Sequence, residues 1–143
     1  MFSGPTRAYD RAITIFSPEG RLYQVEYALE LVKRGAPIAG VSSKEGVALA
    51  ANETPESMLE DGDYFRKIFQ LDEHVAMAIA GLSSDARVLI NQARVYAQSN
   101  RLLYDEPVDV EILARRLGDI TQIYTQHAGV RPFGVSTISG LRQ

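Results

Sequence analysis

The sequence has no cysteine and no tryptophan among its 143 residues. Without cysteine, the chain can form no disulfide, no thiolate zinc site and no cysteine nucleophile of its own. Its apolar runs fall well short of the ~20 residues that a membrane-spanning helix needs. Its first residues also lack the basic-then-apolar order of a secretory signal. We therefore expect a protein without a membrane partner.

The sequence also lacks a large net charge of either sign. The chain carries 15 Lys and Arg against 18 Asp and Glu, for a net charge of -3 and an isoelectric point near 5.4. This balance argues against general binding to nucleic acid, because such binding needs a basic surface. With 45% hydrophobic and 23% charged residues, the composition and length are typical of one globular domain.

The segment from Tyr9 to Gly35 carries the strongest local signals. Its apolar side chains recur at steps of three and four, which predicts an amphipathic helix over residues 18–34. This stripe consists of Leu22, Val25, Leu29 and Val32. Ser17 is the predicted N-cap and Pro18 the first helical residue.

After this helix the pattern predicts two β-hairpins, two long helices and a last strand. In chain order these are strands over 38–42, 47–51, 67–71 and 74–80, helices from 83 or 84 to before 107 and from 109 to 129, and a strand over 133–139. The order indicates an α+β layered fold with both long helices on one face of a sheet.

Several boundaries of these elements have specific signals. Ser83 or Ser84 is the predicted cap of the first long helix and Asp109 that of the second, which Gly129 would close. The second strand, GVALAA, is apolar on both faces, which predicts a central, covered strand.

Two histidines, His74 and His127, are the only candidates for imidazole metal ligands. Neither has a histidine or acidic partner at helical ligand spacing, so we interpret them as surface or helix-end residues. We expect no metal and no cofactor.

Three segments resemble proteasome α-subunits. The segment SPEGRLYQVEYA, led by YDRAITIF, is similar to their N-terminal signature, and AGLSSDARVLINQAR (80–94) and YTQHAGVRPFGVS (124–136) match further along. The resemblance implies the αββα sandwich of the N-terminal-nucleophile hydrolases, with the first helix across its outer end. It covers roughly the first half of the family's length, so we expect a fold truncated after the second long helix and the following strand.

The resemblance also implies a division of the chain and a set of partners. Residues 1–16 would be an N-terminal gate tail and residues 17–143 a partial α-type domain. The partners would be other α-subunits in a seven-membered ring, β-subunits, ATPase or other ring activators, and unfolded protein in transit. YDRAITIFSPEGR looks archaeal, whereas the stretch from 108 to 136 looks at least as much like the third eukaryotic α-type. The location would be the cytoplasm, and also the nucleus if the chain is eukaryotic.

Four residues match a gate cluster of the family: Tyr9, Asp10, Pro18 and Tyr27. From the residues alone, Tyr27 could simply pack and Pro18 could simply start a helix. The resemblance implies that the cluster holds the N-terminal tails in an open arrangement. Tyrosine hydroxyls and a carboxylate are suited to hydrogen bonds between neighbouring copies.

Lys67 matches a lysine that lines a pocket between neighbouring subunits. The resemblance implies that this lysine receives the C-terminal carboxylate of an activator's tail, a role that suits a point-charge ammonium. Gly20, Gly35, Gly81 and Leu82 match residues around the pocket. The alternative is a strand-edge lysine that points to solvent.

The segment His127, Ala128, Gly129 and Val130 matches the family's loop at the narrow entrance behind the gate. The family usually has two glycines where this chain has Ala128 and then Gly129. If the first position needed a positive φ, Ala128 would be strained by about 1 kcal/mol.

Catalysis is not expected. The enzymes of this superfamily use an N-terminal threonine, whereas this chain begins Met-Phe-Ser, so that only processing could expose Ser3. The stretch after the second strand, ANETPES, also lacks the catalytic lysine of those enzymes. We therefore expect a structural and gating subunit. The alternatives are a processed N-terminal-nucleophile peptidase and a truncated module that affects ring assembly.

Overall fold

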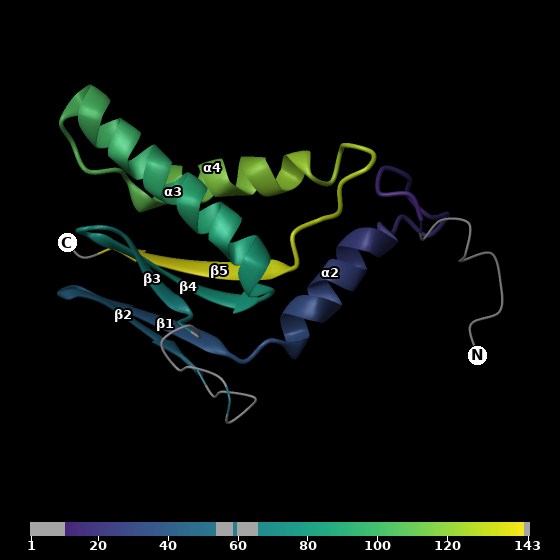
Figure 1. Cartoon of the computed structure of the whole chain (residues 1–143), viewed down its shortest axis with the longest axis horizontal. Helices are drawn as coiled ribbons and strands as arrows, with labels where there is room; N and C mark the ends of the chain where they lie inside the picture. The colour runs from purple at the N-terminus through teal and green to yellow at the C-terminus, as the bar shows by residue number, and fades with distance from the viewer. Residues whose placement is uncertain (1–10, 54–58, 60–65, 142–143) are drawn as a thin grey trace.

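A computed structural model of the chain describes residues 11–53, 59 and 66–141. Tyr9 and Asp10 lie outside this part. Figure 1 shows the elements, which in chain order are α2 (Tyr23–Arg34), β1 (Ile38–Ser43), β2 (Gly46–Ala51), β3 (Ile68–Asp72), β4 (Val75–Gly81), α3 (Ser83–Tyr104), α4 (Val110–Ile123) and β5 (Val135–Leu141). The predicted order of helices and strands is confirmed.

The described residues form three layers. Strands β3, β4 and β5 make one antiparallel sheet with β4 in its centre, and β1 and β2 make a second, two-stranded sheet. Helices α3 and α4 cover one face of the three-stranded sheet, and the two-stranded sheet lies on its other face (Figure 1). Helix α2 lies at one end of both sheets, where it contacts β4 and β5. The predicted α+β layering is therefore confirmed.

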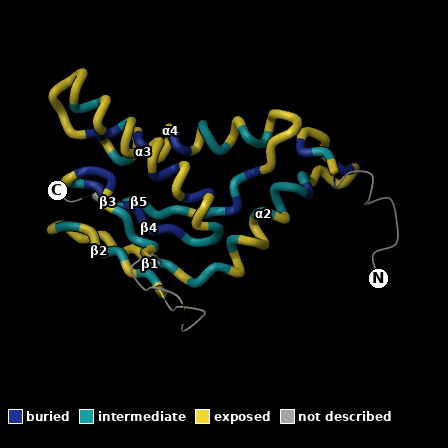
Figure 2. Tube along the Cα trace, in the orientation of Figure 1, coloured by how far each residue is buried: buried dark blue, intermediate teal, exposed yellow. Residues whose placement is uncertain are grey.

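The core lies between α3, α4 and the three-stranded sheet (Figure 2). Because strand side chains alternate, one face of β4 points to the helices. That face carries Val75, Met77 and Ile79, all buried in one cluster with the α3 stripe. The stripe is Ala86, Leu89, Ile90, Ala93 and Ala97, which recur at the three- and four-residue steps of an amphipathic helix.

The expected burial of β2 on both faces is wrong. Among the described residues β2 pairs with β1 alone, and its outer face is exposed at Ala48 and Ala50. Val47 and Leu49 face the other sheet, where a Cβ on Gly140 would lie 2.5 Å from Val47 Cγ1. An apolar run shows that a strand has apolar faces, but it does not show which layer covers them.

The first helix begins five residues later than predicted. Ser17 does not cap a helix, because its hydroxyl accepts from the backbone N–H of Arg21 at 3.1 Å. The Ser17 N–H also donates to the Arg21 carbonyl at 2.9 Å, which closes a turn that includes Pro18. Gly20 has a φ of +76°, incompatible with an α-helix. Helix α2 therefore starts at Tyr23, after an extended Leu22.

The caps of the long helices agree only in part with the sequence signals. Ser83 and Ser84 are both inside α3, and the residue before it is an extended Leu82 with no side-chain cap. The prediction for α4 is confirmed, because Asp109 Oδ1 accepts from the Glu111 N–H at 2.7 Å. Helix α3 ends at Tyr104, before Pro107 as expected.

The expected end of α4 at Gly129 is wrong. The helix stops at Ile123 and continues as tight turns. The Ile123 carbonyl accepts from the Gln126 N–H at 3.0 Å and from His127 Nδ1 at 2.9 Å. These two bonds satisfy the last carbonyl of the helix without a glycine at its end. None of the described helices is long and apolar enough to cross a membrane.

Leu113→Ala tests the core assignment. Leu113 is fully buried on α4, so its truncation should lower the free energy of unfolding by about 2–5 kcal/mol. The matched control is Ile112→Ala, whose side chain is 53% exposed and whose loss should cost less than about 1 kcal/mol. Urea unfolding of the chain measures both, and equal losses would contradict the packing described here.

Candidate functional site

Two members of the predicted gate cluster lie near the start of α2. Pro18 lies in the exposed turn before the helix, and Tyr27 is 52% exposed on its second turn. Tyr23 connects them: its ring stacks on that of Tyr27 with centroids 6.4 Å apart, and its hydroxyl donates to Glu19 Oε2 at 3.2 Å. Burial raises the pKa of the Tyr23 hydroxyl, and Glu19 adds to the shift. The hydroxyl therefore remains a donor at neutral pH.

A charged pair braces the same turn. Arg21 donates through Nε to Glu26 Oε1 at 2.6 Å and through Nη2 to Glu26 Oε2 at 2.5 Å. Its guanidinium also lies over the Tyr23 ring, 5.6 Å from the centroid. The pair links the turn before α2 to the first turn of the helix.

Lys67 lies beside the connection between α2 and β1. Its Nζ donates to the Ala36 carbonyl at 3.2 Å, and its backbone N–H donates to Glu53 Oε1 at 2.6 Å. Its carbonyl accepts from the Ile79 N–H at 2.9 Å. Lys67 is therefore held at the end of the sheet next to the C-terminal end of α2, not directed freely into solvent.

Two glycines allow three segments to meet next to Lys67. A Cβ on Gly35 would lie 2.6 Å from the Gly81 nitrogen, and a Cβ on Gly81 would lie 2.4 Å from the Gly134 carbonyl oxygen. Gly81 also has a φ of +107°, which strains any residue with a side chain. The next residue, Leu82, donates its N–H to the Gly134 carbonyl at 2.9 Å.

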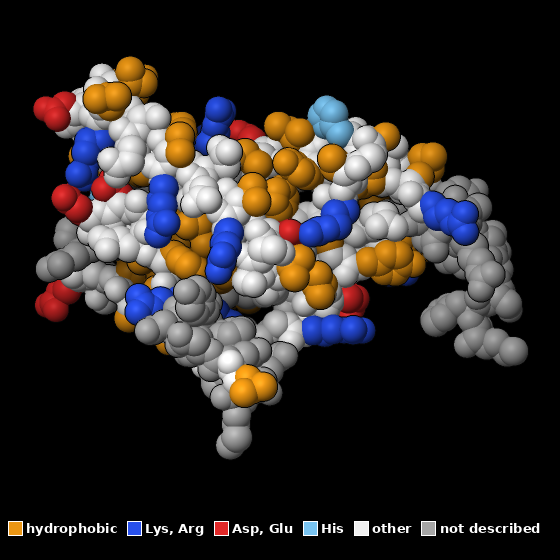
Figure 3. Space-filling model, in the orientation of Figure 1, with side chains coloured by type: hydrophobic (Ala, Val, Ile, Leu, Met, Phe, Trp, Pro, Cys, Tyr) orange, Lys and Arg blue, Asp and Glu red, His pale blue; other side chains and the backbone are white. Residues whose placement is uncertain are grey.

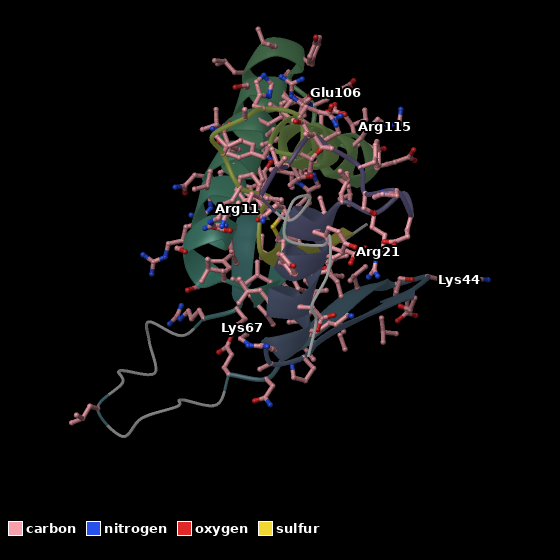
Figure 4. All side chains as sticks on the ribbon, turned by 90° about the vertical axis from the view of Figure 1, so that its right-hand side faces the viewer. Arg11, Arg21, Lys44, Lys67, Glu106 and Arg115 are labelled. Atoms are coloured by element: carbon pink, nitrogen blue, oxygen red, sulfur yellow. The ribbon has the colours of Figure 1, made fainter. Side chains whose placement is uncertain are left out.

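The structure thus brings together four of the five predicted pocket residues: Lys67, Gly35, Gly81 and Leu82. Gly20 is the exception. It precedes the N-terminal end of α2, and the 12 residues of this helix span about 18 Å. Figure 4 shows its neighbour Arg21 and Lys67 on opposite sides of α2. Within one chain, Gly20 does not belong to the Lys67 cluster.

All four residues of the predicted entrance loop, 127–130, are exposed. Gly129 has a φ of +91°, whereas Ala128 is not among the residues with positive φ. The strain expected at Ala128 is therefore absent, because the turn places its positive φ on the glycine. His127 is the helix-end histidine that the sequence indicated.

A charged cluster that the sequence did not reveal lies directly after this loop. Asp85, buried in the first turn of α3, accepts from Arg131 Nη2 at 2.7 Å and from Arg131 Nη1 at 2.6 Å. Asp85 Oδ2 also accepts from the Gly134 N–H at 2.9 Å. The Arg131 guanidinium lowers the pKa of the Asp85 carboxyl, with a smaller contribution from Gly134, against the opposing effect of burial.

Sequence reasoning missed this pair because its partners are 46 residues apart. Asp85 has a sufficient local interpretation as an acid at a helix N-terminus. Arg131 precedes a proline outside any periodic element. The one available signal in the sequence was that Asp85, an acid, falls on the apolar side of the helix, where its side chain would be buried.

His74 is not the surface histidine that the sequence suggested. Its side chain is 16% exposed, and its Nε2 donates to the Val108 carbonyl at 2.9 Å. It lies beside the buried Asp72, which also pairs with Arg101 at 3.3 Å. In the described part of the chain, no group of three or more His, Asp or Glu residues could hold a metal ion.

The layers and the cross-lying α2 define an α-type proteasome fold, of which the described residues hold one helical layer and two sheets. The chain belongs to the proteasome subunit family, because the model of that family matches residues 32–142. A second model, that of the N-terminal signature of A-type proteasome subunits, matches residues 9–30.

Curated relatives agree with this assignment. The chain is 56% identical to the proteasome alpha subunit of Archaeoglobus fulgidus over 94% of its own length and 54% of the relative's. It is 57% identical to that of Methanocaldococcus jannaschii (94% and 51%) and 54% identical to that of Sulfolobus acidocaldarius (98% and 58%). The chain thus spans about half the length of the curated relatives it matches.

Gly81→Ala tests the close approach next to Lys67. The added methyl would collide with the Gly134 carbonyl and would require a strained φ, so the free energy of unfolding should fall by at least about 1–3 kcal/mol. Gly118→Ala is the control, because it sits in the exposed middle of α4 with nothing within 4 Å. That change should stabilise the chain by up to about 1 kcal/mol. If the urea midpoints of Gly81→Ala and Gly118→Ala shifted in the same direction, the close approach of Gly81 to Gly134 would be refuted.

Asp85→Asn tests the buried pair through pH. The folded pKa of Asp85 is lowered from 3.8, so its contribution to stability is present above that pH and is lost as the pH falls through the lowered pKa. We expect the variant to be less stable by about 1–2 kcal/mol at pH 7, a low value because Arg131 is exposed. The difference should shrink below pH 3.8.

Urea unfolding at pH 7 and at acid pH measures this difference. Glu30→Gln is the control, because the Glu30 pKa is also lowered, but by an exposed pair with Lys33. Glu30→Gln should therefore leave the stability nearly unchanged at both pH values, because solvent screens this exposed pair. A loss for Asp85→Asn that is independent of pH would contradict the charged interaction.

Proposed function

We propose that this chain is a non-catalytic structural and gating subunit of the outer α-ring of a proteasome. The observation that carries the proposal is the α-type N-terminal signature at residues 9–30, joined to a fold that matches the same family. Residues 1–16 serve as the gate tail and residues 17–143 as part of the ring-forming domain. The ring controls the access of unfolded protein to the interior of the particle, where separate β-subunits cleave the unfolded protein. Its location is the cytoplasm, and the nucleus as well in a eukaryotic cell.

Exposed apolar side chains support a role in assembly. Three consecutive residues at the end of α3, Leu102, Leu103 and Tyr104, are 87%, 72% and 69% exposed. Figure 3 shows hydrophobic side chains gathered at this tip, in the upper left. Contiguous exposed apolar surface marks a protein–protein interface, and this tip suits contact with another member of the particle.

A second group of exposed apolar side chains lies on α2, where Tyr27 and Leu31 share one side of the helix. Both α2 and the turn at Pro18 lie at the end of the molecule opposite the α3 tip (Figure 1). Two separated surfaces on one chain suit a ring component, which needs contacts both to neighbours within its ring and to the adjoining ring.

Lys67 is the proposed contact for the carboxylate of an activator's tail. An ammonium has three N–H donors, and the Ala36 carbonyl takes one of them. The glycines at 35 and 81 let the backbone of Gly81 and Gly134 pack closely beside Lys67, which fixes the shape of the surface next to the ammonium. Because Gly20 lies at the far end of α2, the complete pocket requires a second copy that brings its own α2 terminus to Lys67.

Native mass spectrometry of the chain, alone and with archaeal α- and β-subunits, tests the proposed function. Incorporation into sevenfold species supports a ring component. A chain that associates with α-subunits and prevents closed rings is instead an assembly module. A chain that remains monomeric with both partners contradicts the proposal, and loss of the N-terminal residues in its intact mass would favour a processed peptidase.

Lys67→Ala should weaken activator docking in particles that contain the chain. Removing one charge-assisted hydrogen bond at a carboxylate costs about 1.5–3 kcal/mol, or roughly ten-fold to a hundred-fold in affinity for the tail peptide. Lys44→Ala is the control, because Lys44 lies in the β1–β2 turn, well away from Lys67 (Figure 4). Fluorescence anisotropy with a labelled tail peptide gives both affinities, and equal values would remove Lys67 from the site.

A further inference from the structure

The candidate entrance loop has little support of its own. Its four residues, 127–130, are all exposed and lie outside every described helix and strand. The shape of such a segment is set by the points where its two ends attach to the core. The contacts on either side of the loop therefore decide where the loop lies.

On its N-terminal side, the loop is attached to the core by an aromatic contact and by the end of α4. The Tyr124 ring contacts that of Phe133 with centroids 4.6 Å apart, so the segment returns to within one side-chain contact of its start. The Ile123 carbonyl accepts from His127 Nδ1, which turns the chain back over the end of α4.

On its C-terminal side, the loop is attached to the core by the Asp85–Arg131 pair. Arg131 follows the loop directly, and its planar fork engages both oxygens of Asp85, a geometry that fixes orientation as well as distance. Arg131 Nη1 also donates to the Pro132 carbonyl at 3.1 Å. The side chain thereby holds both the position and the local path of the backbone as it leaves the loop.

The same pair extends to the Lys67 cluster through Gly134. The Gly134 N–H donates to Asp85 Oδ2, and its carbonyl accepts from the Leu82 N–H. A Cβ on Gly134 would lie 2.7 Å from Leu31 Cδ2 on α2. One residue thus touches α2, the start of α3 and the Gly81–Leu82 junction.

We propose that Asp85 and Arg131 are positioning residues that fix the loop 127–130 relative to the Lys67 cluster. Neither residue contacts substrate or activator in this role. The importance of the loop as an entrance rests on the proposed function, whereas the positioning itself is a property of the chain. If the pair is broken, the loop gains freedom although the core beneath it remains intact.

NMR of the 143-residue chain, as wild type, Asp85→Asn and Arg131→Lys, tests the positioning. Asp85→Asn removes the charge, and Arg131→Lys keeps the charge but removes the fork. In the wild type we expect order parameters near about 0.85 at residues 128–130, and in both variants a fall toward roughly 0.6 or below. The Gly134 amide should exchange at least about ten-fold faster, since it loses a charge-assisted acceptor or the order that the fork imposes.

Arg115→Lys is the matched control, because Arg115 pairs with Glu111 on the exposed face of α4, away from the loop. It should change neither the order parameters nor the exchange at Gly134. If Asp85→Asn fails to fold, the milder Arg131→Lys decides the question alone. Faster exchange at Gly134 with an unchanged loop, or a loop already disordered in the wild type, overturns the proposal.

A second measurement separates this inference from the proposed function. In particles that contain the chain, a displaced loop should change the cleavage rate of an unfolded protein more than that of a short peptide, because a long chain stays in contact with the entrance throughout its passage. A chain that never assembles refutes the ring function, while the order parameters still decide whether the pair positions the loop.

Discussion

Burial of β4 on both faces is the constraint on which the rest of the structure depends. One face places Val75, Met77 and Ile79 beneath α3 and α4, and the other places the fully buried Ala78 toward the two-stranded sheet. Both edges of β4 are also paired, with β3 and with β5. A strand enclosed in this way tolerates no change of register, because a one-residue slip would exchange the large and small faces. The end of β4 at Gly81 is therefore fixed in space, and the candidate site is built from that point.

Close backbone approach then joins the helices to this fixed end. Gly35 ends α2 against Gly81, Gly81 rests on the Gly134 carbonyl, and Gly134 lies against α2. The backbones at Gly35, Gly81 and Gly134 approach one another directly, and the Leu31 side chain of α2 packs on Gly134. Lys67 therefore lies at the edge of a surface formed largely by backbone. The ion pair between Asp85 and Arg131 links two further segments at the same junction. In the proposed arrangement, the close packing at the glycines and the ion pair of the buried Asp85 together hold the Lys67 cluster and the exposed loop in fixed relative positions.

The distribution of exposed apolar side chains agrees with the proposed assembly into a ring. The tip of α3 and one side of α2, at Tyr27 and Leu31, carry leucines and tyrosines that are exposed to water in the single chain. Their positions at opposite ends of the molecule agree with the separation of Gly20 from Lys67, because a pocket that needs both residues must draw them from two copies. In this interpretation, the proposed activator site forms only when the proposed ring forms.

Local sequence signals determined what depends on local physics. The apolar stripe of α3, the Asp109 cap, the end of α3 before Pro107 and the order of all the elements could be predicted, because spacing and capping act within a few residues. Family resemblance added the Lys67 neighbourhood and the α-type identity. Tertiary structure alone decided the exposure of β2, the partners of His74, the position of Gly20 and the pairing of Asp85 with Arg131. Each of these depends on which distant segment lies alongside, and neither periodicity nor composition contains that information.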